Sequence, residues 1–505
     1  SPDADFGYVA VDLLDSVKTE QEYLRNTPVL VTRMYDRSGG CIEITDFSPR
    51  FTQHGRMFCP MMLVRQIRRI AGNPRVRMRV RPASDYGATR ATTTSGSNHI
   101  RYIATGVVVR LTTDASITAT LEESAFYLDD SVTLLLGPDE TVQGSVAEVG
   151  RHFLEETVAY WSGWVRQLGI PFEWQDAVIR AAITLELNVF DDTGAVIAAV
   201  TTSIPEAPGS GRNWDYRYCW LRDATFTLYS LMISGYYEEA QAWREWLLRA
   251  VAGVPSELQI MYGLSGERRL PEYELPWLAG YRDSRPVRVG NAAHLQRQLD
   301  VYGEIMDAFY SSARHGIECL DDANHVQAAL LEYLEGNWQR PDSGIWEARR
   351  PERRYTHSTV MTWVAVDRAI KSAEQFGLSG PVDRWRALRR KIHAEVCERG
   401  FNRARGIFVQ SYGEMALDAA LLLLPLVGFL PPDDPRIRAT TDAIARELVA
   451  AHGGTLSYTP LDPGTRFDIS CPASIRLGCP AGQAGPPSLW VAPLHGPGRP
   501  RPARP

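Results

Sequence analysis

The stretch GRNWDYRYCWLRDA, residues 211–224, is the most distinctive segment of this 505-residue chain. It is a loop crowded with aromatic residues, arginines and acids, and it runs into a helical pattern. Aromatic rings pack on the apolar faces of sugar rings, and Arg and Asp side chains form paired hydrogen bonds with hydroxyl groups. An isolated Arg-Asp dipeptide such as Arg222-Asp223 is ordinarily a surface ion pair. Within the whole stretch, we interpret it as part of a sugar-binding site.

Downstream of this stretch the hydrophobic period is helical. In 320–337, for example, Val326, Leu330 and Leu334 share one face. Long loops rich in Gly, Trp, Arg and acids separate the helices, and such loops commonly carry functional sites. We expect helices over 175–190, 222–235, 236–252, 291–314, 320–337, 356–377, 381–399, 414–427 and 433–451.

Upstream, residues 1–137 have the pattern of β-structure. The stretch 75–81, RVRMRVR, alternates strictly, which is typical of a half-buried strand. Short strands at this spacing predict an antiparallel sandwich. The four arginines of that strand could form a basic patch, although a solvated strand face is the simpler interpretation. Further strands are expected over 28–34, 41–45, 102–111, 116–121 and 131–136, and a linker helix over 147–169.

The composition is that of a globular protein, with 44 % apolar and 23 % charged residues. A net charge of −6, from 54 basic and 60 acidic residues, argues against a nucleic-acid binder. The longest apolar run, 419–430, is too short to span a bilayer, so no membrane association is expected. Seven cysteines without zinc spacing predict reduced thiols and a cytoplasmic protein. The sequence shows no phosphate loop and no metal or nucleotide motif, so we expect no cofactor.

The stretch 211–224 closely resembles the signature of bacterial and archaeal glycoside hydrolase family 15, the glucoamylase and trehalase-like enzymes. Further blocks similar to that family follow in consistent order, and the resemblance covers about residues 20–455. These blocks are LPEYEL (270–275) with GY (280–281), PVRVGNAA (286–293) with Gln296 and QLD (298–300), DSGIWE (342–347) with THS (356–358), and LDA (417–419) through GF (428–429).

The resemblance implies an N-terminal antiparallel β-sandwich, a linker helix and an (α/α)6 barrel of six helix pairs. We place the sandwich at 1–137, the linker at 138–174, the barrel at 175–460 and a tail at 461–505. The nine predicted helices fall short of the twelve in a complete barrel, and we expect that the family's opening strands are also absent before residue 1. The tail, rich in Pro, Gly and Arg, is expected to be disordered and resembles a shifted reading frame.

Family 15 enzymes cleave terminal α-glucosidic bonds with inversion, by means of two carboxylic acids about 6.5–9.5 Å apart. The resemblance makes Glu347 the general acid, whose pKa would be raised by burial beside aromatic residues. It implies that the terminal glucose is bound by a pocket formed by Trp220, Arg222, Asp223 and Trp346. Residues that support or line this pocket are expected to be Arg288, Asn291, Gln296, Asp300, Glu272, Glu274 and His357.

The family's general base lies in a late loop resembling E-E-x-D-P, and this sequence has no such motif. Glu414 and Asp418 remain in the late block, but the family pattern assigns neither of them as the base. Three interpretations therefore stay open. The chain is an exo-acting hydrolase of α-glucan oligosaccharides or trehalose, a non-catalytic sugar-binding or regulatory protein, or a nonfunctional gene fragment.

Overall fold

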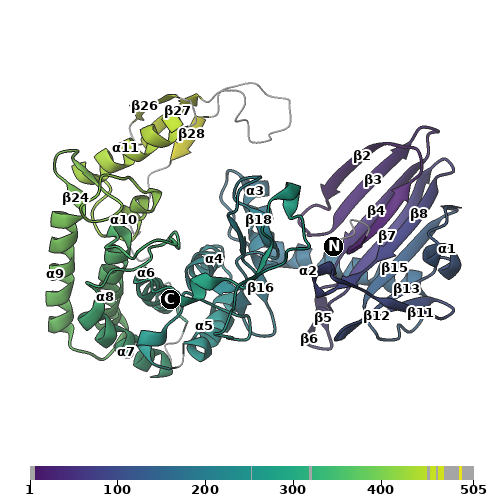
Figure 1. Ribbon diagram of the computed structural model, residues 1–505. Coiled ribbons are helices and arrows are strands. Elements are labelled where there is room, and N and C mark those ends of the chain that lie inside the picture. The colour runs from purple at the N-terminus through teal and green to yellow at the C-terminus, as the bar shows by residue number, and fades with distance from the viewer. Residues whose placement is uncertain are drawn as a thin grey trace, which may run out of the picture. The chain divides into compact units, whose positions relative to one another are not determined.

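The computed structural model describes residues 6–251, 253–317, 321–451, 455–461, 464–470 and 488–491 (Figure 1). The chain divides into two compact units, each described here by itself. The first unit comprises Ser1–Ala252, Met261–Leu295 and Arg314–Ile317. The second comprises Gly253–Ile260, Gln296–Ala313 and Glu318–Pro505.

Two antiparallel sheets face each other in the first unit, so the predicted sandwich is confirmed. The smaller sheet has the order β1 (Tyr8–Leu13), β8 (Arg75–Arg81) and β14 (Phe126–Tyr127). The larger sheet has the order β11 (Thr92–Ser95), β12 (His99–Ala104), β13 (Val107–Thr113), β15 (Ser131–Pro138), β7 (Leu63–Ala71), β4 (Cys41–Phe47), β3 (Leu30–Asp36) and β2 (Ser16–Tyr23).

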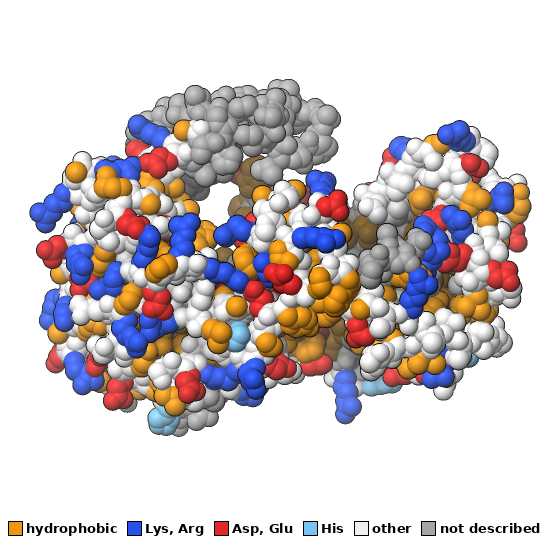
Figure 2. All heavy atoms as spheres, viewed as in Figure 1, with side chains coloured by type: hydrophobic (Ala, Val, Ile, Leu, Met, Phe, Trp, Pro, Cys, Tyr) orange, Lys and Arg blue, Asp and Glu red, His pale blue; other side chains and the backbone are white. Residues whose placement is uncertain are grey.

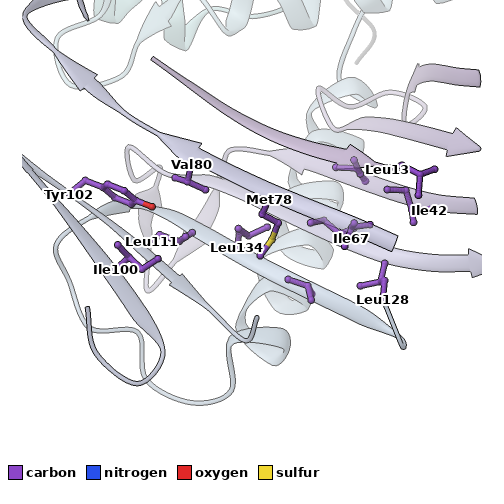
Figure 3. Close-up of a cluster of buried hydrophobic side chains, with 13 residues drawn as sticks. Leu13, Ile42, Ile67, Met78, Val80, Ile100, Tyr102, Leu111, Leu128 and Leu134 are labelled. Atoms are coloured by element: carbon purple, nitrogen blue, oxygen red, sulfur yellow. The ribbon is translucent and has the colours of Figure 1, made fainter. Parts of the chain in front are cut away.

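The core of the sandwich follows from the alternation in β8. Val76, Met78 and Val80 are buried and belong to one hydrophobic cluster with Ile67 and Leu134 of the larger sheet. Figure 3 shows Met78 and Val80 of this cluster beside Leu134. The arginines of β8 point outward. There Arg79 lies 2.7 Å from Asp12, and Arg81 lies 2.6 Å from Glu123. The outward face of β8 is therefore a solvated face whose arginines form ion pairs, which agrees with the simpler interpretation.

Two strand predictions in this unit were wrong. The stretch 102–111 is a hairpin of β12 and β13, because Gly106 adopts a left-handed φ of 75° and turns the chain. The stretch 116–121 contains the short helix α1 (Ile117–Leu121). Ser116 caps this helix, since its Oγ accepts a hydrogen bond from the Ala119 amide at 3.2 Å.

The predicted linker helix is α2 (Val146–Val165), which covers the other face of the larger sheet. Val146 and Phe153 pack with Val64 and Leu135 of that sheet. At its far end, Trp161 packs against α3 (Gln175–Glu186) and α4 (Leu221–Ile233). The first unit also contains α5 (Glu238–Ala250), together with short hairpins formed by β5 (Phe51–Gln53) and β6 (Arg56–Phe58), β9 (Ala83–Ser84) and β10 (Thr89–Arg90), and β16 (Val189–Phe190) and β17 (Ala195–Val196).

The second unit is mainly helical. Its longest helix, α8 (Thr356–Phe376), is buried over most of its length and packs against α9 (Val382–Arg399). Gly377 ends α8 in a left-handed conformation with φ 76°, which glycine adopts without strain. The remaining helices are α6 (Asp300–Arg314), α7 (Asp321–Asn337), α10 (Leu423–Leu426) and α11 (Pro435–Ala451), and a short hairpin joins β24 (Phe401–Asn402) to β25 (Ile407–Phe408).

Two predicted helices are shorter than expected. The stretch 291–314 becomes helical only at Asp300, after a single 3-10 turn at Ala292–Leu295. The stretch 414–427 forms only a 3-10 turn, Ala419–Leu422, and the four-residue α10. The predicted helices are divided between the two units, and their closure into a barrel of helix pairs stays a prediction.

At the C-terminal end, β26 (Thr455–Leu461), β27 (Gly464–Ser470) and β28 (Ser488–Val491) form a three-stranded antiparallel sheet. The expected absence of regular structure in the tail therefore does not hold for these strands. Residues 471–487 and 492–505 of the predicted tail lie outside the described residues. Within the described part of the chain, no helix combines the length and the apolar character needed to cross a membrane.

Candidate active site

In the first unit, the stretch 211–224 is folded as two short strands followed by a helix. β19 (Asn213–Asp215) pairs with β18 (Thr202–Pro205), and β20 (Cys219–Trp220) pairs with β21 (Met261–Tyr262). Trp220 is buried, and its ring lies 5.5 Å from that of Tyr216. Arg222 and Asp223 follow in the first turn of α4, where their charged groups lie 3.1 Å apart. The helix dipole favours the Asp223 carboxylate at this position.

Arg288 connects three segments of the same unit. It lies on β23 (Arg288–Val289), which pairs with β22 (Tyr273–Glu274). Its guanidinium donates hydrogen bonds to the carbonyls of Gly211 at 2.9 Å and Asn213 at 3.1 Å, and stacks over Trp214 at 4.6 Å. It also lies 3.6 Å from Glu272 and 3.4 Å from Glu274. Arg288 therefore positions the 211–214 loop against the loop that carries both glutamates.

Asn291 has a similar supporting role. It is buried, and its Nδ2 donates to the Asp215 carbonyl at 3.2 Å. The Glu272 carboxylate accepts a hydrogen bond from the Ala292 amide at 3.0 Å. Asp215, which sequence reasoning did not select, is fully buried and accepts from Arg217 at 2.9 Å and from the Gly290 amide at 3.1 Å. The only sequence signal for Asp215 was its place within the quoted stretch.

In the second unit, Glu347 lies in a loop whose backbone is held at several points. The backbone N–H and C=O of Asp342 each bond to Arg353 at 2.9 Å. Gly344 turns the chain with φ 67°, and a Cβ at this position would lie 2.8 Å from the ring of Tyr355. Glu347 is half-buried and has a left-handed φ of 53°, a strained conformation that non-glycine residues adopt mainly where surrounding contacts enforce it.

Two side-chain hydrogen bonds complete the support of this loop. The Nε2 of Gln296 donates to the Glu347 carbonyl at 3.2 Å. The indole of Trp346, which is 57 % exposed, donates to Oδ1 of Asp418 at 2.8 Å. The structure thus brings Gln296, Trp346 and Glu347 together.

Comparison with known proteins decides the family. Residues 174–469, more than half of the chain, match the model of the glycosyl hydrolases family 15. The chain belongs to this family. It is therefore a glycoside hydrolase by descent, in agreement with the resemblance carried by its motifs.

Similar proteins include two that are named trehalase. The trehalase of Mycobacterium tuberculosis is 35 % identical over 86 % of this chain and 68 % of its own length. The trehalase of Thermoplasma acidophilum is 30 % identical over 88 % of this chain and 77 % of its own length. Among solved structures, a glycosidase in complex with glucose matches 58 % of this chain and 73 % of its own chain, with 20 % identity and a TM-score of 0.42.

A second carboxylate in the 342–347 loop of this family 15 protein was missed by sequence reasoning. Asp342 is buried, and its Oδ2 accepts a hydrogen bond from the Leu299 amide at 2.8 Å. Burial, together with the negative charge of Asp300, raises the pKa of Asp342 to about 7. Asp300 itself is buried in the first turn of α6, and neither of its carboxylate oxygens has a hydrogen-bond partner among the described residues. Asp342 was quoted within DSGIWE, but only tertiary structure shows that it lies near Asp300.

The other candidate side chains of the second unit are buried or hydrogen-bonded within the fold. His357 is buried in the first turn of α8. Asp418 caps the turn that precedes α10 and also accepts from Gln410 at 3.0 Å. Glu414 accepts from Ser411 at 2.8 Å and pairs with Arg353. Among the described residues, no group of three or more His, Cys, Asp or Glu side chains is arranged to hold a metal ion.

Proposed function

We propose that this family 15 protein hydrolyses a terminal α-glucosidic bond with inversion, and that Glu347 protonates the leaving oxygen. The observation that carries the proposal is the backbone of Glu347, held in a left-handed conformation by the hydrogen bonds of Gln296 and of the 342–347 loop. A general acid must be held within hydrogen-bond reach of the bond it cleaves, and a backbone fixed on both sides meets that requirement.

We propose trehalose as the preferred substrate and α-glucan oligosaccharides as the alternative. The proposal rests on two relatives named trehalase that align with most of this chain. Trp220, Arg222 and Asp223 are proposed to bind the terminal glucose. Arg288, Asn291 and Gln296 are proposed to act through the loops that they position.

Asp418 and Glu414, which lie near the loop of Glu347, are already engaged by other groups. Asp418 is occupied by the Trp346 indole, the Gln410 amide and a backbone amide. Glu414 is held by Ser411 and Arg353. We therefore assign the activation of water in the inverting reaction to neither of them.

The test is glucose release from trehalose and from maltotriose by the purified full chain. Glu347→Gln keeps the shape of the side chain but removes the acid, and general acid catalysis is typically worth about 10²–10⁴ in rate. We expect the variant to lose activity by that order while its melting temperature stays unchanged. Glu352→Gln, at a partly exposed glutamate five residues along the chain, is the matched control. Absence of glucose release from both sugars by the unmodified chain would overturn the proposal, and sugar binding without turnover would favour a binding role.

A further inference from the structure

A cavity of about 370 Å³ lies in the second unit, between α8, α9 and the turn that follows α10. Its wall is formed by Trp363, Asp367 and Lys371 of α8, which recur every fourth residue and so share one face of the helix. The facing helix α9 contributes three side chains, and the turn contributes Gly428 and Phe429. α8 and α9 run side by side in Figure 1, and none of these residues belongs to the proposed active site.

The charged side chains that line the cavity carry a net positive charge. Asp367 is the only acid of the wall, and it is buried between Lys371 at 2.7 Å and Arg389 at 2.7 Å. Arg390 brings a third positive charge to the wall and forms no ion pair with any side chain that the structure describes. Three cations and one carboxylate leave two positive charges facing the cavity.

The remaining titratable group of the wall does not change this excess. Burial, together with the positive charges of Arg436 and Arg389, lowers the pKa of His393 below its ordinary value. Its imidazole is therefore neutral near pH 7. Arg368 also pairs with Asp367, but it is not a residue of the wall, and its charge is offset by its second partner, Asp307. The excess of two positive charges is a property of Lys371, Arg389 and Arg390.

The wall of the cavity also contains aromatic side chains. The rings of Trp363 and Phe429 meet edge to face at 5.2 Å, and His393 lies 4.7 Å from Phe429. The volume falls within the range of small-molecule sites, about 300–1,000 Å³. Such a site accommodates a molecule with an anionic end and a less polar ring, because its wall offers both cationic groups and aromatic rings.

We propose that this cavity binds the phosphate group of a small phosphorylated molecule, of which a sugar phosphate is the class that best fits the aromatic residues of the wall. A phosphomonoester carries close to two negative charges at pH 7 and accepts several hydrogen bonds, which matches two unbalanced cationic side chains. The proposal is independent of the hydrolysis proposed above, because none of the wall residues belongs to the 342–347 loop or to the 211–224 stretch.

Isothermal titration calorimetry of the full chain tests this site with glucose 6-phosphate, inorganic phosphate and glucose as probes. We expect glucose 6-phosphate to bind, and Arg390→Glu to weaken that binding about tenfold or more, equivalent to about 1.4 kcal/mol. Lys371→Met should weaken it similarly while Arg368 and Arg389 still neutralise Asp367. Lys391→Glu is the matched control, since it makes the same charge change on the next residue, whose ammonium lies 5.7 Å from the Trp338 ring instead.

The three probes distinguish the sources of the anion. Tighter binding of glucose 6-phosphate than of inorganic phosphate supports a sugar phosphate, whereas equal affinities, both lowered by Arg390→Glu, support the same site with free phosphate as its ligand. Glucose binding should be unchanged in Arg390→Glu. The proposal is overturned if neither phosphate compound binds, or if binding is the same in the Arg390→Glu and Lys391→Glu variants.

Discussion

The indole N–H of Trp346 donates a hydrogen bond to Oδ1 of Asp418 at 2.8 Å, and the same oxygen accepts from the Ala420 amide at 2.8 Å. One carboxylate therefore ties the loop of the proposed general acid to the cap of the turn before α10. Because Trp346 directly precedes Glu347, this bond restrains the acid from its N-terminal side.

We expect Asp418→Ala to destabilise the protein by about 1–2 kcal/mol, since it removes a cap and a buried acceptor. Trp346→Phe removes the indole hydrogen bond but keeps an aromatic ring, and it should cost less. A double-mutant cycle from urea unfolding should give a coupling energy of about 0.5–1.5 kcal/mol between the two residues. A coupling near zero would show that the hydrogen bond does not hold the loop.

Asp342 makes the stability of the second unit depend on pH. Its pKa is raised to about 7 in the folded protein, so the folded state holds a proton that the unfolded chain releases from about pH 4 upward. Stability should therefore fall as pH rises from about 4 to about 7, by up to about 4 kcal/mol from this group, and then level off. Asp342→Asn, which stays neutral and keeps an acceptor for the Leu299 amide, should remove most of that slope in melting temperature against pH.

Asp300→Asn separates the two causes of this shift. Without the negative charge of Asp300 the pKa of Asp342 should be lower than in the unmodified protein, because burial is then left as the effect that raises it. The pH window of declining stability should accordingly move to lower pH, while Asp342 remains titratable. An unchanged window in Asp300→Asn would mean that the two carboxyl groups do not interact.

These buried carboxyl groups illustrate what the sequence could and could not predict. Strict alternation predicted β8 and its buried Val76, Met78 and Val80, because a strand's period is expressed locally. The motif DSGIWE located Glu347 and Trp346 in one loop. The proximity of Asp342 to Asp300 depends on how the loop packs on the start of α6, and no local pattern encodes it. The prediction of a helix over 414–427 was wrong, because the backbone of Asp418 is extended and its side chain caps the next turn.

Arg50 is a buried cation that joins the sandwich to the helical part of the first unit. Its guanidinium donates to Glu186 at 2.8 Å, to Asp191 at 2.5 Å and to Tyr160 at 3.2 Å. Leaving a buried polar group without its hydrogen-bond partner typically costs about 1–3 kcal/mol, and Arg50→Met leaves Glu186 and Tyr160 without their donor. We expect Arg50→Met to lower the free energy of unfolding by about that amount in urea titrations.

Arg33→Met is the control for Arg50. Arg33 pairs with Glu22 and Glu43 at 2.9 Å, but its side chain is 40 % exposed. Exposed ion pairs contribute about 0–1 kcal/mol, so this variant should unfold close to the unmodified protein. Equal losses in the two variants would contradict the assignment of Arg50 as a buried connection.

Glu186, the partner of Arg50, is expected to lose its proton at a higher pH than an ordinary glutamate. Burial and the charge of Glu239 raise its pKa to about 8, although Arg50 acts in the opposite direction. The folded state therefore retains a proton between about pH 4 and pH 8 that the unfolded state releases, and this group makes stability fall as pH rises through that window. Glu186→Gln should melt at a higher temperature than the unmodified protein at pH 8.5 and at a similar temperature at pH 4. A constant difference between the two proteins at both pH values would exclude this titration.

Gly344 is the residue that lets the 342–347 loop turn close to the ring of Tyr355. It has φ 67°, and an added Cβ would lie 2.8 Å from the Tyr355 ring, closer than real Cβ atoms approach. Gly344→Ala should therefore cost both the strain of a left-handed backbone, about 1–2 kcal/mol, and a steric clash. Gly406→Ala provides the comparison, because Gly406 has φ 70° but open space around its Cα. In thermal melts, Gly344→Ala should be destabilised by at least about 1 kcal/mol more than Gly406→Ala. Glucose release should fall in Gly344→Ala alone, because only that glycine shapes the loop of Glu347, and equal effects of the two substitutions would show that the contact with Tyr355 does not restrain the loop.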